Sequence, residues 1–153
     1  MIRIIRFQSK HSEATSKFIL DILEGEFGIV GEERPDLYRI PEVYQKRKSN
    51  FWLAMDGGEV VGTVALVDYG KSRGYLKRMY VGKKFRGTLL AKRLLETVLA
   101  FARMNAIREI YAGTVPEMAA ANKFYQKHGF KKIEELPPDF PEFGDTIFYS
   151  LTL

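Results

Sequence analysis

The sequence predicts a single α/β domain of the layered α+β kind, in which helices flank a mixed, mostly antiparallel central sheet. Two runs rich in β-branched and aromatic residues, 51–55 and 60–67, flank a glycine-containing turn at 56–59, which is the pattern of a β-hairpin. A later stretch carries apolar residues at helical spacing and predicts a long amphipathic helix: Leu90, Leu94, Val98 and Phe101. Strand-like and helix-like stretches follow one another without a linker, so we expect one domain over residues 1–153.

The remaining elements follow from the same two periodicities. Residues 2–7 predict a short first strand, and Ser12 with Glu13 opens a helix-like stretch. Glycines and prolines interrupt the segment 25–49, which predicts short helices and loops. The second half predicts, in order, a strand over 75–81, the long helix from Gly87 to Asn105, a strand over 107–113, a helix over 118–128 ended by Gly129, and strands within 131–135 and 146–153.

The composition excludes several kinds of chemistry. The chain has no cysteine, which removes disulfides, iron–sulfur clusters and cysteine nucleophiles. Its two histidines, His11 and His128, lie too far apart in sequence to suggest a two-histidine metal motif, so we expect no metal. The chain also lacks an apolar run of about 18 residues and an apolar leader at its start, so we expect a cytoplasmic protein without membrane association.

The excess of positive charge is concentrated where a strand gives way to a helix. The chain carries a formal net charge of +5. Seven of its cations lie close together near this junction: Lys77, Arg78, Lys83, Lys84, Arg86, Lys92 and Arg93. The first turn of a helix has backbone N–H groups without intrahelical partners and a partial positive charge, and Gly87 would let a phosphate approach the backbone closely. The junction therefore predicts a phosphate site, although the motifs of Walker A loops, dinucleotide-binding folds and serine hydrolases are missing.

The junction resembles the acetyl-coenzyme A signature of the GCN5-related N-acetyltransferase (GNAT) superfamily, Q/R-x-x-G-x-G/A. Here the signature reads Arg86-Gly87-Thr88-Leu89-Leu90-Ala91, with Leu89 where the family has glycine. Residues 76–81 resemble the family's fourth strand, and residues 120–130 resemble its N-x-x-F-Y-x-x-x-G-F segment. The resemblance covers about Phe51 to Leu153, and the segment before it matches only in its order of elements.

The resemblance implies that acetyl-coenzyme A is the co-substrate. Backbone groups of residues 79–81 would pair with its pantetheine arm like an extra strand, and backbone amides of residues 87–91 would hold its pyrophosphate while Arg86 screens the charge. Asn122 would bond to the pantetheine or position the next helix. The implied contacts are Met79, Tyr80, Val81, Arg86, Gly87, Thr88, Leu89, Leu90, Ala91 and Asn122.

The resemblance also implies one catalytic residue. Tyr125 would place its hydroxyl near the thioester sulfur as the general acid for the leaving thiolate. The alternative is that Tyr125 is simply a core aromatic. No glutamate stands at the place where related enzymes often carry a base, and Tyr75 occupies it. The base is therefore open: a water chain could serve, or one of four carboxylates, Glu26, Glu32, Glu33 and Asp68.

The acceptor cannot be identified from the sequence alone. The segments 25–49 and 137–145 should shape its pocket. Their carboxylates would suit a cationic amine: Glu32, Glu33, Asp36 and Asp145. Three aromatic residues could line the same pocket or belong to the core: Trp52, Tyr38 and Tyr44.

We therefore expect an N-acetyltransferase that moves the acetyl group from acetyl-coenzyme A to a primary amine of a small molecule, peptide or protein by direct attack. The alternative is a non-catalytic module that binds coenzyme A or RNA through the basic junction. Its place between a strand and a helix favours a small phosphate ligand over nucleic acid. A homodimer formed through a sheet edge stays open.

Overall fold

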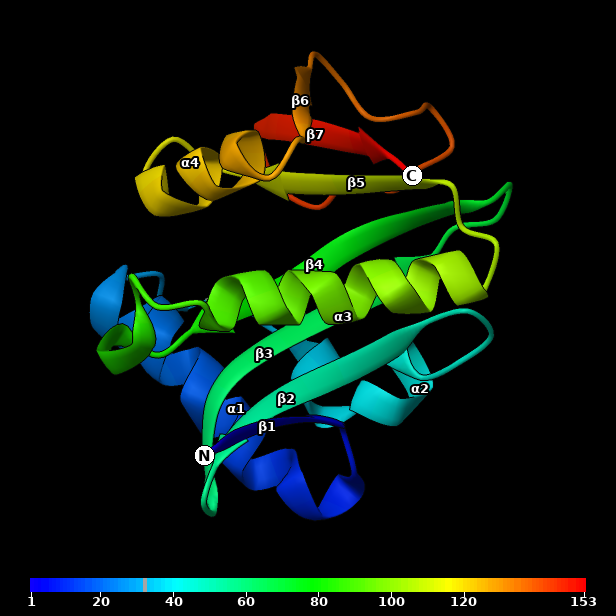
Figure 1. Cartoon of the computed structure of the whole chain (residues 1–153). Coiled ribbons are helices and arrows are strands. Elements are labelled where there is room, and N and C mark those ends of the chain that lie inside the picture. Colours follow the sequence, from blue (N-terminus) through cyan, green and yellow to red (C-terminus); the bar gives the residue numbers. More distant parts are fainter. Residues whose placement is uncertain (32) are drawn as a thin grey trace.

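The computed structural model describes residues 1–31 and 33–153, and these build one twisted seven-stranded sheet with helices on both faces (Figure 1). The strand order is β1-β2-β3-β4-β5-β7-β6. The strands are β1 (Ile2–Arg6), β2 (Asn50–Asp56), β3 (Glu59–Asp68), β4 (Arg73–Val81), β5 (Glu109–Thr114), β6 (Lys131–Ile133) and β7 (Ile147–Thr152). Neighbouring strands are antiparallel except β4 and β5, which are parallel. The predicted fold class is confirmed.

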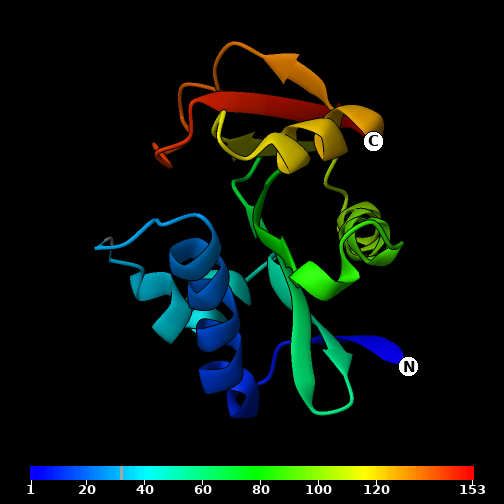
Figure 2. The same cartoon turned by 90° about the vertical axis from the view of Figure 1, so that its left-hand side faces the viewer.

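The helices form a layer on each face of the sheet. They are η1 (Ser9–His11), α1 (Ser12–Leu20), η2 (Asp21–Glu26), η3 (Pro35–Tyr38), α2 (Ile40–Tyr44), η4 (Lys83–Phe85), α3 (Leu90–Met104) and α4 (Ala119–Lys127). Figure 2 shows the segment from α1 to α2 on one side of the strands and α3 on the other. Each layer encloses its own hydrophobic cluster, one containing Leu94 and Val98 of α3 and the other containing Ile19 of α1 and Ile40 of α2.

Helix α3 has the amphipathic pattern that the sequence predicts, but it begins three residues later than expected. Leu90, Leu94 and Val98 are buried, and each buried aliphatic side chain contributes about 1.5–3 kcal/mol. The expected first residue, Gly87, has φ +78°, which is a left-handed conformation that no α-helix accepts. The helix therefore starts at Leu90, and the residues before it form a loop.

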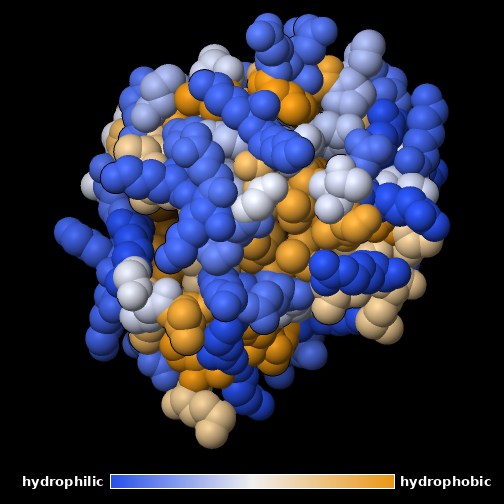
Figure 3. All heavy atoms as spheres, turned by 45° about the horizontal axis from the view of Figure 1, so that its top comes forward, coloured by the Kyte–Doolittle hydropathy of each residue, from blue (hydrophilic) through white to orange (hydrophobic). Residues whose placement is uncertain are grey.

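The apolar surface is not completely covered on the face that carries α3. Figure 3 shows hydrophobic atoms gathered at the centre of the view, surrounded by hydrophilic side chains. The cluster on the α3 side of the sheet includes hydrophobic residues that stay only partly buried, among them Leu99, Phe124 and Leu151. No helix formed by residues 1–31 or 33–153 combines the length and hydrophobicity that a membrane crossing requires.

The parallel strands β4 and β5 separate along their length. Their pairing runs from Arg73 with Glu109 to Leu76 with Ala112 and then stops, although β4 continues to Val81 and β5 to Thr114. Figure 1 shows the two strands diverging toward the ends where α3 and α4 begin. Backbone groups at the far ends of both strands are therefore left without a partner strand on this side, and the site described below lies around them.

Candidate active site

The separation of β4 from β5 is accompanied by a bulge in β4. The pairing of β3 with β4 shifts register between Thr63 and Ala65, opposite Arg78, whose φ of +52° lies in the left-handed region. The hydroxyl of Thr63 donates to the Arg78 carbonyl at 2.7 Å and holds this strained backbone in place. Met79 and Val81 pack on the α3 side of the sheet and Tyr80 on the α1 side. These three predicted cofactor contacts therefore lie on the part of β4 that β5 does not pair with.

The loop between β4 and α3 presents unpaired backbone donors. Within the described chain, the amides of Gly87, Leu89 and Ala91 donate to no acceptor, whereas the hydroxyl of Thr88 accepts from the Leu90 amide at 3.3 Å. Such a cluster of free N–H groups at the start of a helix suits a phosphate group. The exposed side chains of Lys83 and Lys84 in the same segment add positive charge.

Leu89 does not obstruct this loop. Its φ of −79° is negative and therefore open to residues with a side chain, so the backbone there has no need of glycine. Its side chain is 70% exposed and points away from the core. The departure from the family signature is therefore compatible with the loop geometry, and the glycine with a positive φ is Gly87.

Arg86 contacts two other parts of the chain. Its Nε donates to the Val81 carbonyl at 3.0 Å, and its Nη2 lies 2.6 Å from Oε2 of Glu26 at the end of η2. Glu26, one of the carboxylates considered as a base, is thus the partner of a cation at the loop between β4 and α3. The ion pair ties the end of η2 to the edge of β4.

Tyr125 lies in an aromatic cluster near the gap between the strands. Its ring is 7% exposed and contacts Phe130 and Tyr149 at centroid distances of 5.2 and 5.4 Å. No described residue forms a hydrogen bond with its hydroxyl. Burial raises the pKa of Tyr125, and the nearby Tyr80 and Asp145 raise it further. The hydroxyl therefore keeps its proton at neutral pH and can donate it.

Asn122 is fully engaged in local contacts. Its amide nitrogen donates to the carbonyls of Val115 and Met118, and its oxygen accepts from the Tyr149 hydroxyl at 2.6 Å. These bonds fix the loop that leads from β5 into α4. Thr114, at the end of β5, has a buried hydroxyl without a partner among the described residues. Like the Tyr125 hydroxyl, the Thr114 hydroxyl is a polar group at the gap, but no sequence motif points to it.

A cluster that the sequence did not reveal occupies the α1 side of the gap. The Tyr75 hydroxyl donates to Oδ2 of Asp145 at 3.0 Å, and the Tyr75 ring stacks on Phe143 with centroids 4.1 Å apart. Lys77 lies two residues along β4, with its Nζ 5.0 Å from the centre of the Phe143 ring. No carboxylate of the described chain lies within ion-pair distance of this ammonium group.

Other residues considered for the acceptor pocket prove to have structural roles. Asp36 does not offer a free carboxylate to a cationic amine, because Arg78 binds both of its oxygens at 2.9 Å and the Tyr44 hydroxyl donates to it at 2.5 Å. Tyr44 is fully buried, and Trp52 is 4% exposed in the core, so neither lines a pocket. Tyr38 is 77% exposed.

The surroundings of Glu33 and Asp68, two further carboxylates considered as the base, do not support that role. Glu33 is exposed, and Asp68 accepts from the amide of Gly70 in the turn between β3 and β4. Glu32 lies outside the described residues.

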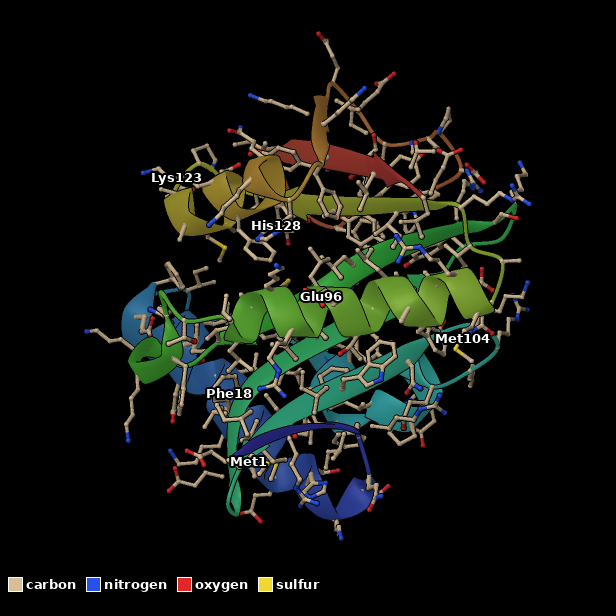
Figure 4. All side chains as sticks on the ribbon, viewed as in Figure 1. Met1, Phe18, Glu96, Met104, Lys123 and His128 are labelled. Atoms are coloured by element: carbon tan, nitrogen blue, oxygen red, sulfur yellow. The ribbon has the colours of Figure 1, made fainter. Side chains whose placement is uncertain are left out.

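His128 lies away from the Tyr75 cluster. It ends α4 and faces α3, where Glu96 lies (Figure 4). Burial lowers the pKa of His128, and the positive charges of Lys127 and Lys92 lower it further. Its ring packs on Phe124 at a centroid distance of 4.4 Å. The ring thus packs on its own helix, with charged groups of α3 within electrostatic reach.

Comparison with known proteins identifies the family. Residues 16–130 match the model of the Acetyltransferase (GNAT) family. A solved GNAT-family acetyltransferase from Staphylococcus aureus superposes with a TM-score of 0.94 at 33% identity, covering 99% of both chains. The PaiA N-acetyltransferase of Thermoplasma acidophilum, solved with coenzyme A, superposes over 100% of this chain and 99% of its own with a TM-score of 0.82; at 16% identity it shows the shared fold.

Curated relatives align with only part of this chain. N-acetylaspartate synthetase of Xenopus tropicalis is 37% identical over 102 residues, which are 65% of this chain and 38% of that protein. N-acetyltransferase 8 of Mus musculus is 37% identical over 94 residues, which are 58% of this chain and 41% of that protein. The chain thus spans about two fifths of the length of these relatives. The family match, which covers most of the chain, and the close structural agreement lead to one conclusion: the chain belongs to the GNAT family of acetyltransferases.

Proposed function

We propose that this protein is an N-acetyltransferase that transfers the acetyl group of acetyl-coenzyme A to a primary amine by direct attack. The observation that carries the proposal is the Tyr125 hydroxyl, which has no partner among the described residues and lies beside the gap between β4 and β5. The phosphate loop borders the same gap. The comparisons, which identify acetyltransferases, favour the enzyme over a non-catalytic binding module.

The co-substrate would bind along the free part of β4. Backbone groups of Met79, Tyr80 and Val81 would pair with the pantetheine arm, and the free amides of Gly87, Leu89 and Ala91 would hold the pyrophosphate. Arg86 would neutralise phosphate charge from its position beside Val81. The bonds of Asn122 to its own loop support a positioning role rather than direct contact.

The chemistry needs little more than placement and one acid. The bound thioester supplies an activated acetyl group, and the thiolate that leaves must gain a proton. With its pKa raised, the Tyr125 hydroxyl is protonated over the whole physiological range, so a proton is present when negative charge develops on the sulfur. No covalent intermediate with the protein is required.

For the acceptor we propose a small amine that also carries a carboxylate, such as an amino acid. Lys77 is a half-buried ammonium group without an ion-pair partner in the described chain, and it lies on the α1 side of the gap, where the amine would enter. A carboxylate on the acceptor would complete this pair. The relatives named N-acetylaspartate synthetase carry in that name the N-acetyl derivative of an acceptor of this class, which supports the choice.

The test replaces Tyr125 by phenylalanine, with Tyr38→Phe as the matched control on the exposed surface. We expect Tyr125→Phe to lower kcat by about 10²–10⁴-fold while the Kd for coenzyme A stays within about twofold. Coenzyme A release with L-aspartate and hydroxylamine as acceptors gives the rate, and calorimetry gives the Kd. Unchanged turnover in Tyr125→Phe would remove the acid role. Tight binding of a short RNA with a steep salt dependence, without turnover, would favour the binding module instead.

A further inference from the structure

The loop that precedes β7 brings one carboxylate to the gap between β4 and β5. The amide of Thr146 donates to the Thr114 carbonyl at 3.0 Å, which fixes the loop against the end of β5. Asp145, one residue earlier, accepts from the Tyr75 hydroxyl through Oδ2 at 3.0 Å. Its other oxygen, Oδ1, accepts from no group of the described chain. One oxygen is therefore held in place while the other can take a proton.

Gly113 of β5 makes room for this pair. A Cβ built on Gly113 would overlap both the Tyr75 hydroxyl and the Asp145 carboxylate, so any larger residue would force these side chains to shift. The Cα of Gly113 lies just beyond Ala112, the last residue of β5 that pairs with β4. The hydroxyl and the carboxylate thus lie at the point where the two strands part, beside the expected path of the thioester.

Asp145 differs from the other aspartate of its loop. Asp139 is bound by Arg73 through both oxygens and lies 3.8 Å from the Lys71 ammonium, so it fastens the loop to the turn before β4. Asp145 has no such ion pair, and its only hydrogen bond to a side chain comes from Tyr75.

The charged and titratable groups around Asp145 come from two elements, β4 and α4. Burial raises the pKa of Asp145, and it outweighs the opposing effects of the Tyr75 hydrogen bond and of Lys77 and Arg78, all on β4. From α4, Tyr125 interacts with the same carboxylate. Gly113 of β5, which also adjoins the carboxylate, adds no titratable group. A carboxylate with a raised pKa is a better proton acceptor, and this one lies within electrostatic reach of the proposed acid.

We propose that Asp145 is the general base of this site and accepts a proton from the ammonium form of the acceptor, with Tyr75 as a positioning residue. The inference rests on the proposed function. Asp145 Oδ1 removes one proton and passes it to water. The neutral nitrogen attacks the thioester carbon, the carbon–nitrogen bond forms, and the carbon–sulfur bond breaks with its electron pair left on sulfur. Tyr125 gives its proton to the sulfur and regains one from the nitrogen.

Two kinds of acceptor, one uncharged and one protonated, separate the role of the base from the rest of the reaction. Hydroxylamine is uncharged at neutral pH and needs no base to become a nucleophile, whereas L-aspartate, glycine and glucosamine carry protonated amines. The variant Asp145→Asn keeps an oxygen that can accept from Tyr75 but cannot take the proton. We expect it to lose about 10²–10⁴-fold in kcat/KM with the protonated amines and to stay within about threefold of the wild type with hydroxylamine.

The pH profile gives a readout that a structural role would not move. The rate of Asp145→Asn with a protonated amine should rise about tenfold per pH unit, because only the neutral amine fraction reacts. Tyr75→Phe removes a hydrogen bond that favours the charged carboxylate, so the acidic limb of the profile should move to higher pH. Glu142→Gln, an exposed change in the same loop, should leave both rates and both profiles unchanged.

The outcomes are distinct. An equal loss with hydroxylamine and with the protonated amines in Asp145→Asn would overturn the base role, provided that its Kd for coenzyme A is unchanged. A wild-type enzyme that acetylates hydroxylamine but no protonated amine at any pH would also overturn it. Failure of the wild type with every probe, hydroxylamine included, would instead count against the proposed acetyltransferase itself.

Discussion

Arg78 and Asp36 form a two-pronged ion pair between the bulge of β4 and the short helix η3. Nε and Nη2 of Arg78 donate to Oδ2 and Oδ1 of Asp36, each at 2.9 Å, and the two side chains are 15% and 16% exposed. The pair fastens the segment between α1 and β2 to the strand that carries the site. Because both partners are largely buried, loss of one leaves the other charge uncompensated.

Asp36→Asn should therefore destabilise the protein by about 3–5 kcal/mol at neutral pH, measured by urea denaturation. Burial alone would raise the pKa of Asp36, but the hydrogen bonds and charge of Arg78 outweigh it and the net pKa is lowered. The contribution of the carboxylate to the free energy of unfolding is thus complete above its unfolded pKa and is lost as the pH falls through the lower folded pKa. The difference in free energy of unfolding between the wild type and Asp36→Asn should therefore shrink only in that acid range.

The matched control is Asp21→Asn, which breaks the exposed pair between Lys17 and Asp21 on neighbouring turns. It should change the free energy of unfolding by about 0.3–0.5 kcal/mol. A similar small effect from Asp36→Asn would show that the buried pair contributes no more than an exposed one.

Gly87 and Leu89 should respond in opposite ways to substitution. Gly87→Ala places a side chain at φ +78°, at a strain of about 1–2 kcal/mol, and should weaken coenzyme A binding about tenfold by distorting the loop. Leu89→Gly should leave the Kd within about twofold, because Leu89 is exposed and glycine is accepted at a helix N-cap. Calorimetric titration with coenzyme A measures both. A large loss in Leu89→Gly would mean that the leucine side chain itself contacts the ligand.

Glu26 should compete with the co-substrate for Arg86. Its carboxylate lies 2.6 Å from the guanidinium at the phosphate loop, where a second negative charge opposes a polyanion. Glu26→Gln should therefore tighten coenzyme A binding a few-fold, and the gain should decrease at high salt, where charges are screened. The control is Glu13→Gln, a change at an exposed position of α1. Weaker binding in Glu26→Gln would show that the carboxylate orients Arg86 for the phosphate.

Gly113→Ala tests the packing of the Tyr75 and Asp145 pair. The new methyl group would overlap both side chains, so we expect a destabilisation of about 1–3 kcal/mol and a fall in turnover with protonated amines. Gly58→Ala has no neighbouring atom within 4 Å of the added methyl group and should be close to neutral. Thermal unfolding and the amine assay of both variants provide the comparison. Equal behaviour of the two would mean that the loop before β7 readily moves aside.

The sequence could predict those features that depend on residues close together along the chain. The hairpin of β2 and β3 and the stripe of α3 follow from local periodicity, and the left-handed Gly129 after α4 follows from a local cap. The apolar stripe places the start of α3 three residues early, because it does not reveal the positive φ of Gly87.

Contacts between distant segments were beyond sequence reasoning. Tyr75 and Asp145 are 70 residues apart, and Arg78 and Asp36 are 42 apart. The sequence marks Asp145 only as one of several carboxylates near the acceptor. To single it out, one must know which loop the strand order of the sheet brings beside β4. For the same reason Asp36 was expected to face a ligand, although the fold places it against Arg78.

The short pairing between β4 and β5 also has a consequence for motion. The β1–β4 and β5–β7 parts of the sheet share pairing only from Arg73 to Leu76 and from Glu109 to Ala112. A seam held by so few backbone hydrogen bonds should open more readily than the interior of either part, and amide hydrogen exchange would report this opening. A ligand strand lying along β4 would close the seam, so slower exchange at these amides would accompany binding. The strand edge that would bind the co-substrate and the most easily opened line of the sheet would then adjoin each other.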